Sequence, residues 1–116
     1  MLKSFVRGET EWQALTALGA RLDFDLDGLH VEEPANAPLY EASVIDVATG
    51  LLAKWKTQEA VQAWARVLLA TSMIDLRCLE DHPDGEVLLE AVWDAAEGAD
   101  INDRQRAVAQ EHATTG

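Results

Sequence analysis

The chain has 116 residues, 48% of them hydrophobic, and carries a formal net charge of -12 at pH 7. This length suits one domain with its own core, and the apolar content excludes disorder for most of the chain despite the charge. Because a strongly negative protein repels nucleic acid and anionic membranes, we expect no direct nucleic-acid binding and no membrane partner.

The acidic residues concentrate in two stretches that contain no Lys or Arg, residues 22–46 and residues 80–103. The remainder of the chain carries all nine Lys and Arg residues and five acids. Segregation of this kind builds a negative field that attracts a basic partner. The acids of the two stretches are Asp23, Asp25, Asp27, Glu32, Glu33, Glu41 and Asp46, then Glu80, Asp81, Asp84, Glu86, Glu90, Asp94, Glu97, Asp100 and Asp103.

The N-terminal segment is apolar at Leu2, Phe5 and Val6 and ends at Gly8. Thr10 then predicts the N-cap of a first helix over residues 11–20. Its apolar residues recur at three- and four-residue steps, which gives one stripe that must pack on another element.

A β-hairpin is predicted over residues 21–33, around the dipeptide Asp27-Gly28, which suits a type I′ turn. With those two residues as the loop, Leu26 lies opposite Leu29 and Phe24 lies opposite Val31, so the apolar residues of both strands share one face. The strands alternate polar and apolar residues, as expected for a ribbon with one buried side.

The same segment resembles the first half of an EF-hand calcium loop, since Asp23, Asp25 and Asp27 alternate before Gly28. The twelfth position of such a loop needs a bidentate glutamate, and here it is Pro34. We therefore favour the hairpin over a calcium site.

Two central helices are expected next. Pro38 indicates a start for a helix over residues 39–54, in which Gly50 is either a weak point or a close helix crossing. Thr57 predicts the N-cap of a longer helix from Gln58 to about Leu79, apolar on most of its circumference and therefore central.

The C-terminal third predicts a helix over residues 86–97 that ends before Gly98, and a short helix over residues 103–111 with Asn102 as its cap. We expect one compact domain over residues 1–111 and a frayed tail over residues 112–116. The fold class is α+β, mainly helical, with four or five helices around a long central helix and one small hairpin.

No motif indicates an enzyme, a cofactor or a metal. His30, His82 and His112 lie in three separate segments without the spacing of a zinc site, and His82 with Asp84 suggests a cap more than an acid–base pair. The glycines are scattered singly, so no phosphate-binding loop is present. The single cysteine, Cys78, is interpreted as core packing.

The predicted helix over residues 86–97 carries the candidate partner-binding residues. Trp93 falls away from the apolar stripe of that helix, so it either borders an acidic face or closes the rim of the core. The alternative for the carboxylates is a solvated surface without a partner. The candidate residues are Asp84, Glu86, Glu90, Trp93, Asp94 and Glu97.

The function expected from this pattern is that of a small acidic, non-enzymatic bacterial protein that binds a basic protein partner, by the electrostatic logic of immunity proteins, antitoxins and inhibitors. The alternative is a homo-oligomeric accessory domain, with Trp12, Tyr40 or Trp55 at a two-fold interface. Because the chain has no long apolar run and no signal-peptide pattern at its start, we expect a cytoplasmic location.

Overall fold

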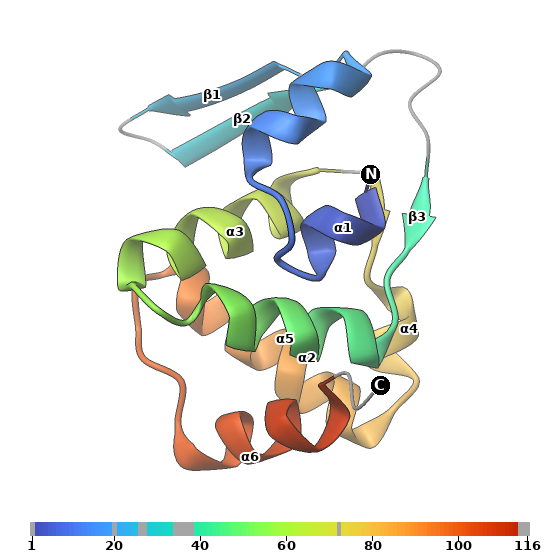
Figure 1. Cartoon of the computed structure of the whole chain (residues 1–116), viewed down its shortest axis with the longest axis vertical. Coiled ribbons are helices and arrows are strands. Elements are labelled where there is room, and N and C mark those ends of the chain that lie inside the picture. The colour runs from blue at the N-terminus through green and yellow to red at the C-terminus, as the bar shows by residue number, and fades with distance from the viewer. Residues whose placement is uncertain (1, 20, 26–27, 34–38, 72, 114–116) are drawn as a thin grey trace.

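The computed structural model describes residues 2–19, 21–25, 28–33, 39–71 and 73–113. The fold class is confirmed, because these residues form an α+β, mainly helical fold with one antiparallel hairpin (Figure 1). In chain order the elements are α1 (Leu2–Val6), the 3₁₀ helix η1 (Trp12–Leu18), β1 (Arg21–Asp25), β2 (Gly28–Glu32), β3 (Tyr40–Glu41), α2 (Val44–Lys54), α3 (Gln58–Ala70), β4 (Ile74–Asp75), α4 (Arg77–Glu80), α5 (Pro83–Ala96) and α6 (Asp103–His112).

The hairpin is confirmed, but its predicted register is wrong by two residues. Strands β1 and β2 pair so that Leu22 lies opposite Val31 and Asp25 lies opposite Gly28. Gly28 therefore belongs to β2, and the remaining loop positions 26 and 27 lie outside the described residues. A pattern of period two fixes which face a position occupies, but it is equally satisfied by a shift of two, so the alternation alone could not choose.

Because Asp23 and Asp25 lie in strand β1, this segment is a hairpin ribbon and not an EF-hand loop. Leu22 is half-buried and packs against the core. The hairpin lies over one end of α3, next to η1 (Figure 1).

The prediction of one long helix from Gln58 to about Leu79 is wrong in its second half. Helix α3 ends at Ala70, because Thr71 adopts an extended conformation with φ -86° and ψ 139°. The buried Thr71 hydroxyl accepts a hydrogen bond from the Met73 amide and donates one to Glu33, at 3.1 and 2.6 Å. The chain then forms β4, which pairs in parallel with β3.

The predicted start of the preceding helix is also wrong, whereas its end at Lys54 is confirmed. Helix α2 begins at Val44, and Ser43 is its N-cap in a reciprocal capping box with Asp46. Residues 40 and 41 are held in strand β3 instead, through the bond from the Tyr40 amide to the Met73 carbonyl. A capping box and a strand partner outweigh the helix-start signal of Pro38.

The predicted first helix is a 3₁₀ helix, η1, and its N-cap is Glu11 instead of Thr10. Gly19 ends it in the left-handed conformation, with φ 92°. The Thr10 hydroxyl is the buried side-chain polar atom that has no hydrogen-bond partner among the described residues.

Gly50 marks a close helix crossing, one of its two predicted roles. A Cβ atom at Gly50 would lie 1.9 Å from the Val6 carbonyl oxygen and 2.7 Å from the Trp64 ring. The buried Trp64 indole donates to the carbonyls of Phe5 and Val6, at 3.2 Å each. Helix α1 is thereby fixed against α2 and α3 at the centre of the core.

Helices α5 and α6 carry the candidate site. Helix α5 begins at Pro83, three residues earlier than predicted, with His82 as its N-cap, and Gly98 follows it with φ 87°. The predicted Asn102 cap of α6 is confirmed as a capping box with Gln105. Helix α5 packs on α3 and α4, and α6 packs on α2 and α5.

No helix in the described ranges is both long enough and apolar enough to cross a membrane.

The interpretation of Cys78 as a core residue is wrong, because this cysteine is exposed on the single-turn helix α4. The sequence placed it inside a long apolar helix, and that helix does not extend so far.

Candidate functional site

The exposed side of α5 presents three glutamates and one tryptophan in a row. Glu86, Glu90 and Trp93 of α5 and its C-cap residue Glu97 follow one another at steps of four, three and four residues, so they lie on one side of the helix and its C-terminal end. All four are exposed to solvent. We refer to these four residues as the α5 stripe.

Trp93 is 54% exposed, so it borders the acidic face and does not close the rim of the core. Among the described residues, the other large apolar side chains that are exposed are Leu39 on the strand side and Ile45 on α2. An exposed tryptophan removes a large apolar area from water when it is covered, and tryptophan is common at binding hot spots. Trp93 therefore adds an exposed apolar area to the acidic face.

The carboxylates of the α5 stripe have no salt-bridge or hydrogen-bond partner in the part of the chain that the structure describes. Acids elsewhere do have cationic partners: Glu11 binds the buried Lys54 at 2.7 Å, and Asp75 binds Arg77 at 2.7 Å. Among the described residues, no cationic side chain therefore pairs with the carboxylates of the stripe.

Asp84 and Asp94 were predicted to belong to the same exposed face, but the side chains of both contact helix α6 instead. Asp94 Oδ2 accepts a hydrogen bond of 3.0 Å from Gln105, whose side chain is buried. Asp84 lies 2.7 Å from the His112 ring. The structure thus brings together four of the six predicted residues as a surface and uses the other two to hold α6.

Helix α3 fixes the end of α5 near Glu97. The side chains of Gln62 and Arg66 donate to the Ala96 carbonyl at 3.3 and 3.1 Å, and Gln58 donates to the Gly98 carbonyl. These bonds satisfy carbonyls that a helix end leaves without partners. The α5 stripe therefore lies on a rigid helix, which lowers the entropic cost of binding.

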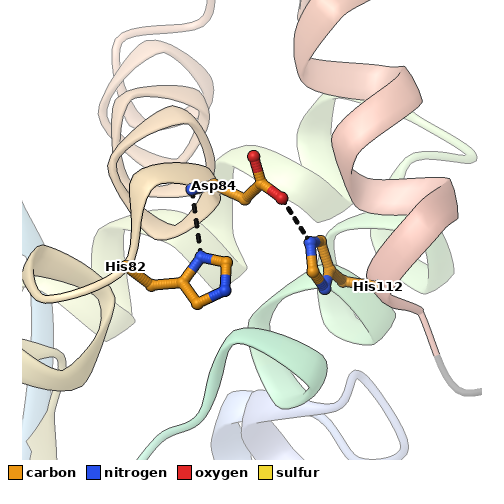
Figure 2. Close-up of side chains that lie close together, drawn as sticks. All are labelled: His82, Asp84 and His112. Atoms are coloured by element: carbon orange, nitrogen blue, oxygen red, sulfur yellow. Dashed lines mark hydrogen bonds and ion pairs between the residues drawn. The ribbon is translucent and has the colours of Figure 1, made fainter.

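A second cluster lies at the opposite end of α5, where His82, Asp84 and His112 meet (Figure 2). The Asp84 amide donates to His82 Nδ1 at 3.0 Å, which is the predicted cap. The two imidazole rings are 5.4 Å apart between centroids and nearly perpendicular, at 86°. One ligand atom from each residue lies within 4.8 Å of the others.

The sequence did not reveal this cluster. His82 and Asp84 are neighbours in the chain, but His112 comes from the last turn of α6, 28 residues after Asp84. No spacing rule connects residues so far apart when a whole helix and a loop intervene. Only knowledge that α6 packs on α5 would have indicated the cluster, and the apolar pattern of α6 alone does not specify that packing.

Similarity to known proteins identifies no family for this chain. Models of protein families give no match, and neither characterised proteins nor solved structures show a significant similarity. The interpretation of both sites therefore depends on their geometry.

A buried carboxylate outside these sites has a structural role. Burial alone would raise the pKa of Asp46, but hydrogen bonds from Tyr40, Ser43 and Arg7 hold this pKa below its usual value. Burial and the hydrogen bond to Asp46 raise the pKa of Tyr40 to about 12. This network joins α1, β3 and the start of α2.

A surface pocket of about 340 Å³ lies at the end of α3, lined mainly by apolar side chains. Its charged lining residues, Asp75 and Arg77, pair with each other through several hydrogen bonds. That pairing lowers the pKa of Asp75 and raises that of Arg77. The two charges neutralise one another, which gives the pocket no polar group set apart for a ligand.

Proposed function

We propose that this protein binds the basic surface of another protein through the α5 stripe, Glu86, Glu90, Trp93 and Glu97. The observation that carries the proposal is the position of an exposed tryptophan among three carboxylates that have no partner in the described part of the chain. The carboxylates would pair with Lys or Arg side chains of the partner, and Trp93 would be covered at the centre of the contact.

The chemistry of the stripe favours arginine and lysine over other partner groups. Carboxylates form charge-assisted hydrogen bonds with guanidinium and ammonium groups. The face of an exposed indole attracts the same cations, by about 0.5 to 2 kcal/mol. A partner whose patch combines basic side chains with an apolar depression for Trp93 satisfies both parts of the stripe.

The net charge of -12 supports rapid encounter with such a partner. A field of one sign raises the association rate with an oppositely charged surface and weakens as salt is added. The same field opposes nucleic acid and anionic membranes, and it opposes contact between two copies through their acidic stripes.

The test is capture of partners from the native cell lysate at low and at high salt, with two charge-matched variants as additional baits. The stripe variant carries Glu86→Lys, Glu90→Lys and Glu97→Lys. The control variant carries Glu80→Lys, Asp100→Lys and Glu111→Lys, all of which are also exposed. Asp84 and Asp94 stay unchanged in both, because they hold α6.

We expect a basic protein that is retained at low salt, lost at high salt, retained by the control variant and lost by the stripe variant. A single change, Trp93→Ala, should weaken its binding by roughly 30-fold, the equivalent of about 2 kcal/mol for a hot-spot residue. Equal retention by both triple variants would contradict the proposal, because the general charge of the protein would then explain the capture.

Self-association remains the alternative function. Tyr40 and Trp55, two of the residues considered for a two-fold interface, are half-buried and pack against the core. Sedimentation velocity at two protein concentrations separates the alternatives. A rising sedimentation coefficient, together with a lysate that yields no basic partner, would favour the homo-oligomeric domain.

A further inference from the structure

The second cluster, at the start of α5, has the composition of a transition-metal site. We propose that His82, Asp84 and His112 bind one divalent metal ion of the zinc class. Among the described residues this is the group of three His, Cys, Asp or Glu side chains close enough together to share an ion. The proposal is independent of the function proposed for the α5 stripe.

The distances between the three ligand atoms are close to those found around a bound zinc ion. Zinc binds imidazole nitrogen and carboxylate oxygen at about 2.0 to 2.2 Å, so tetrahedral ligand atoms are roughly 3.3 Å apart. Asp84 Oδ2 and His112 Nε2 are 2.7 Å apart in a hydrogen bond that the ion would replace, and all three ligand atoms lie within 4.8 Å of one another. Closure therefore requires a side-chain movement of roughly 1.5 Å.

The side chain that must move is the one with the most freedom. His82 is exposed, whereas Asp84 and His112 are half-buried and lie on two packed helices. Figure 2 shows one oxygen of the Asp84 carboxylate directed to the His112 ring, while the His82 ring is bonded to the Asp84 backbone amide. A turn of the His82 ring gives up the bond from the Asp84 amide, and water can take its place at this exposed helix end.

The helices hold the two less mobile ligands in place without the metal. Gln105, which is buried, connects α6 to Asp94 and closes the capping box with Asn102. Gly85 lets the start of α5 approach α4, since a Cβ atom there would lie 2.1 Å from the Leu79 carbonyl oxygen. These contacts bring His112 to Asp84 across 28 residues of chain.

Two electrostatic effects act on a cation at this place, and they differ in size. The N-terminus of α5 carries a partial positive charge of about half an elementary charge, which disfavours a cation. The Asp84 carboxylate brings a full negative charge into direct contact with the ion, and the net charge of -12 adds to it. The attraction of the cation by the Asp84 carboxylate therefore exceeds its repulsion by the N-terminus of α5.

The ligand types select the metal. Two imidazole nitrogens and one carboxylate oxygen suit Zn²⁺, Co²⁺, Ni²⁺ or Cu²⁺, whereas Ca²⁺ and Mg²⁺ prefer oxygen ligands alone. On binding, the metal takes the lone pair of His112 Nε2, so the ring proton is carried on Nδ1. Three protein ligands leave a fourth position open to water.

The experiment titrates the purified full chain with Zn²⁺ by calorimetry and with Co²⁺ by visible absorption, whose intense bands report tetrahedral coordination. Three variants are compared. His82→Ser removes a ligand but retains a good N-cap for α5. His112→Gln removes a ligand but can still hydrogen-bond to Asp84, and Glu111→Gln is the control, an exposed acid beside His112.

We expect one Zn²⁺ per chain for the wild type and for Glu111→Gln, a rise in their melting temperature with Zn²⁺, and tetrahedral Co²⁺ bands. His82→Ser and His112→Gln should each bind about tenfold or more weakly and lose the rise in melting temperature. Circular dichroism without metal checks their folding, and if His112→Gln is unfolded, His82→Ser decides.

Two results would overturn the metal site. One is a wild-type chain that binds no stoichiometric Zn²⁺. The other is binding that His82→Ser and His112→Gln retain in full, which would place the ion on the general acidic surface. None of the three metal ligands belongs to the α5 stripe, and Zn²⁺ binding is measured without a protein partner, so failure of one proposal does not imply failure of the other.

Discussion

At the scale of single residues, Gly50 occupies the point where α1, α2 and α3 come closest. We predict that Gly50→Ala destabilises the protein by about 3 kcal/mol, because overpacking at a rigid contact forces backbone movement. The added Cβ would lie 1.9 Å from the Val6 carbonyl oxygen and would also press on the Trp64 ring. Urea unfolding followed by circular dichroism measures the change.

The sign of that change is informative, because a glycine inside a helix usually gains stability on replacement by alanine. The matched control is Ala53→Gly, at an exposed position of the same helix, which should cost about 1 kcal/mol through helix propensity alone. If Gly50→Ala were as stable as the wild type, the close crossing would be wrong.

The buried carboxylate of Asp46 makes the free energy of unfolding depend on pH. Its pKa in the folded state is below its usual value, so its contribution is complete above an unfolded-state pKa of about 3.9 and is lost as the pH falls through the folded-state pKa. We predict that Asp46→Asn costs about 2 kcal/mol at pH 7 and progressively less below pH 4.

Unfolding curves of the wild type and Asp46→Asn at a series of pH values test this dependence. Glu59, an exposed acid in the first turn of α3 with no side-chain partner among the described residues, supplies the control, and Glu59→Gln should change stability by less than about 1 kcal/mol at any pH. A difference between wild type and Asp46→Asn that stays constant from pH 7 to pH 2 would contradict the ionic role of Asp46.

At the scale of elements, one buried amide contributes to the attachment of α6 to α5. The Gln105 side chain is 2% exposed, donates to Asp94 and accepts from the Asn102 amide. We predict that Gln105→Ala costs about 2 kcal/mol, because the loss leaves a buried cavity and a helix start without its capping box.

Hydrogen exchange locates the effect of that change. Amides of α6 should exchange faster in Gln105→Ala, whereas those of α3 should lose protection only through the fall in global stability. The matched control is Gln110→Ala, on the exposed side of the same helix. Equal exchange in Gln105→Ala and Gln110→Ala would show that α6 is held by other contacts.

Local signals predicted the elements that depend on neighbouring residues. The caps Thr57 and Asn102, the glycine after α5 and the hairpin all follow from short patterns, and the structure has them. The same patterns indicated Trp93 as a side chain away from the apolar stripe. Those patterns left open whether Trp93 borders the acidic face or closes the rim of the core, and its exposure in the structure decides for the acidic face.

Features that depend on distant pairing were not predicted. The parallel strands β3 and β4 have two residues each, too few for an alternation signal, and they join positions 40 and 74. Their pairing ended α3 early, shortened α2 and exposed Cys78. For the same reason the contact between His112 and Asp84 could not be predicted, because only the packing of α6 on α5 brings the two side chains together.

At the scale of the whole molecule, charge and burial divide the acidic residues into two groups. Asp46, Asp84 and Asp94 hold elements together through hydrogen bonds, whereas the glutamates of the α5 stripe face solvent. The proposed surface and the proposed metal site therefore use different carboxylates of one helix. Replacing the stripe should leave folding intact, which makes the surface testable by mutation.

The measurement that tests the central proposal most directly is hydroxyl-radical footprinting of the protein alone and with the protein captured from the lysate. Trp93 in α5, Ile45 in α2 and Leu39 before β3 are 54%, 48% and 62% exposed, so all three are accessible to the radical. If the α5 stripe is the binding surface, oxidation of Trp93 falls in the complex while that of Ile45 and Leu39 stays the same. Protection of Ile45 or Leu39 with Trp93 unchanged would contradict it.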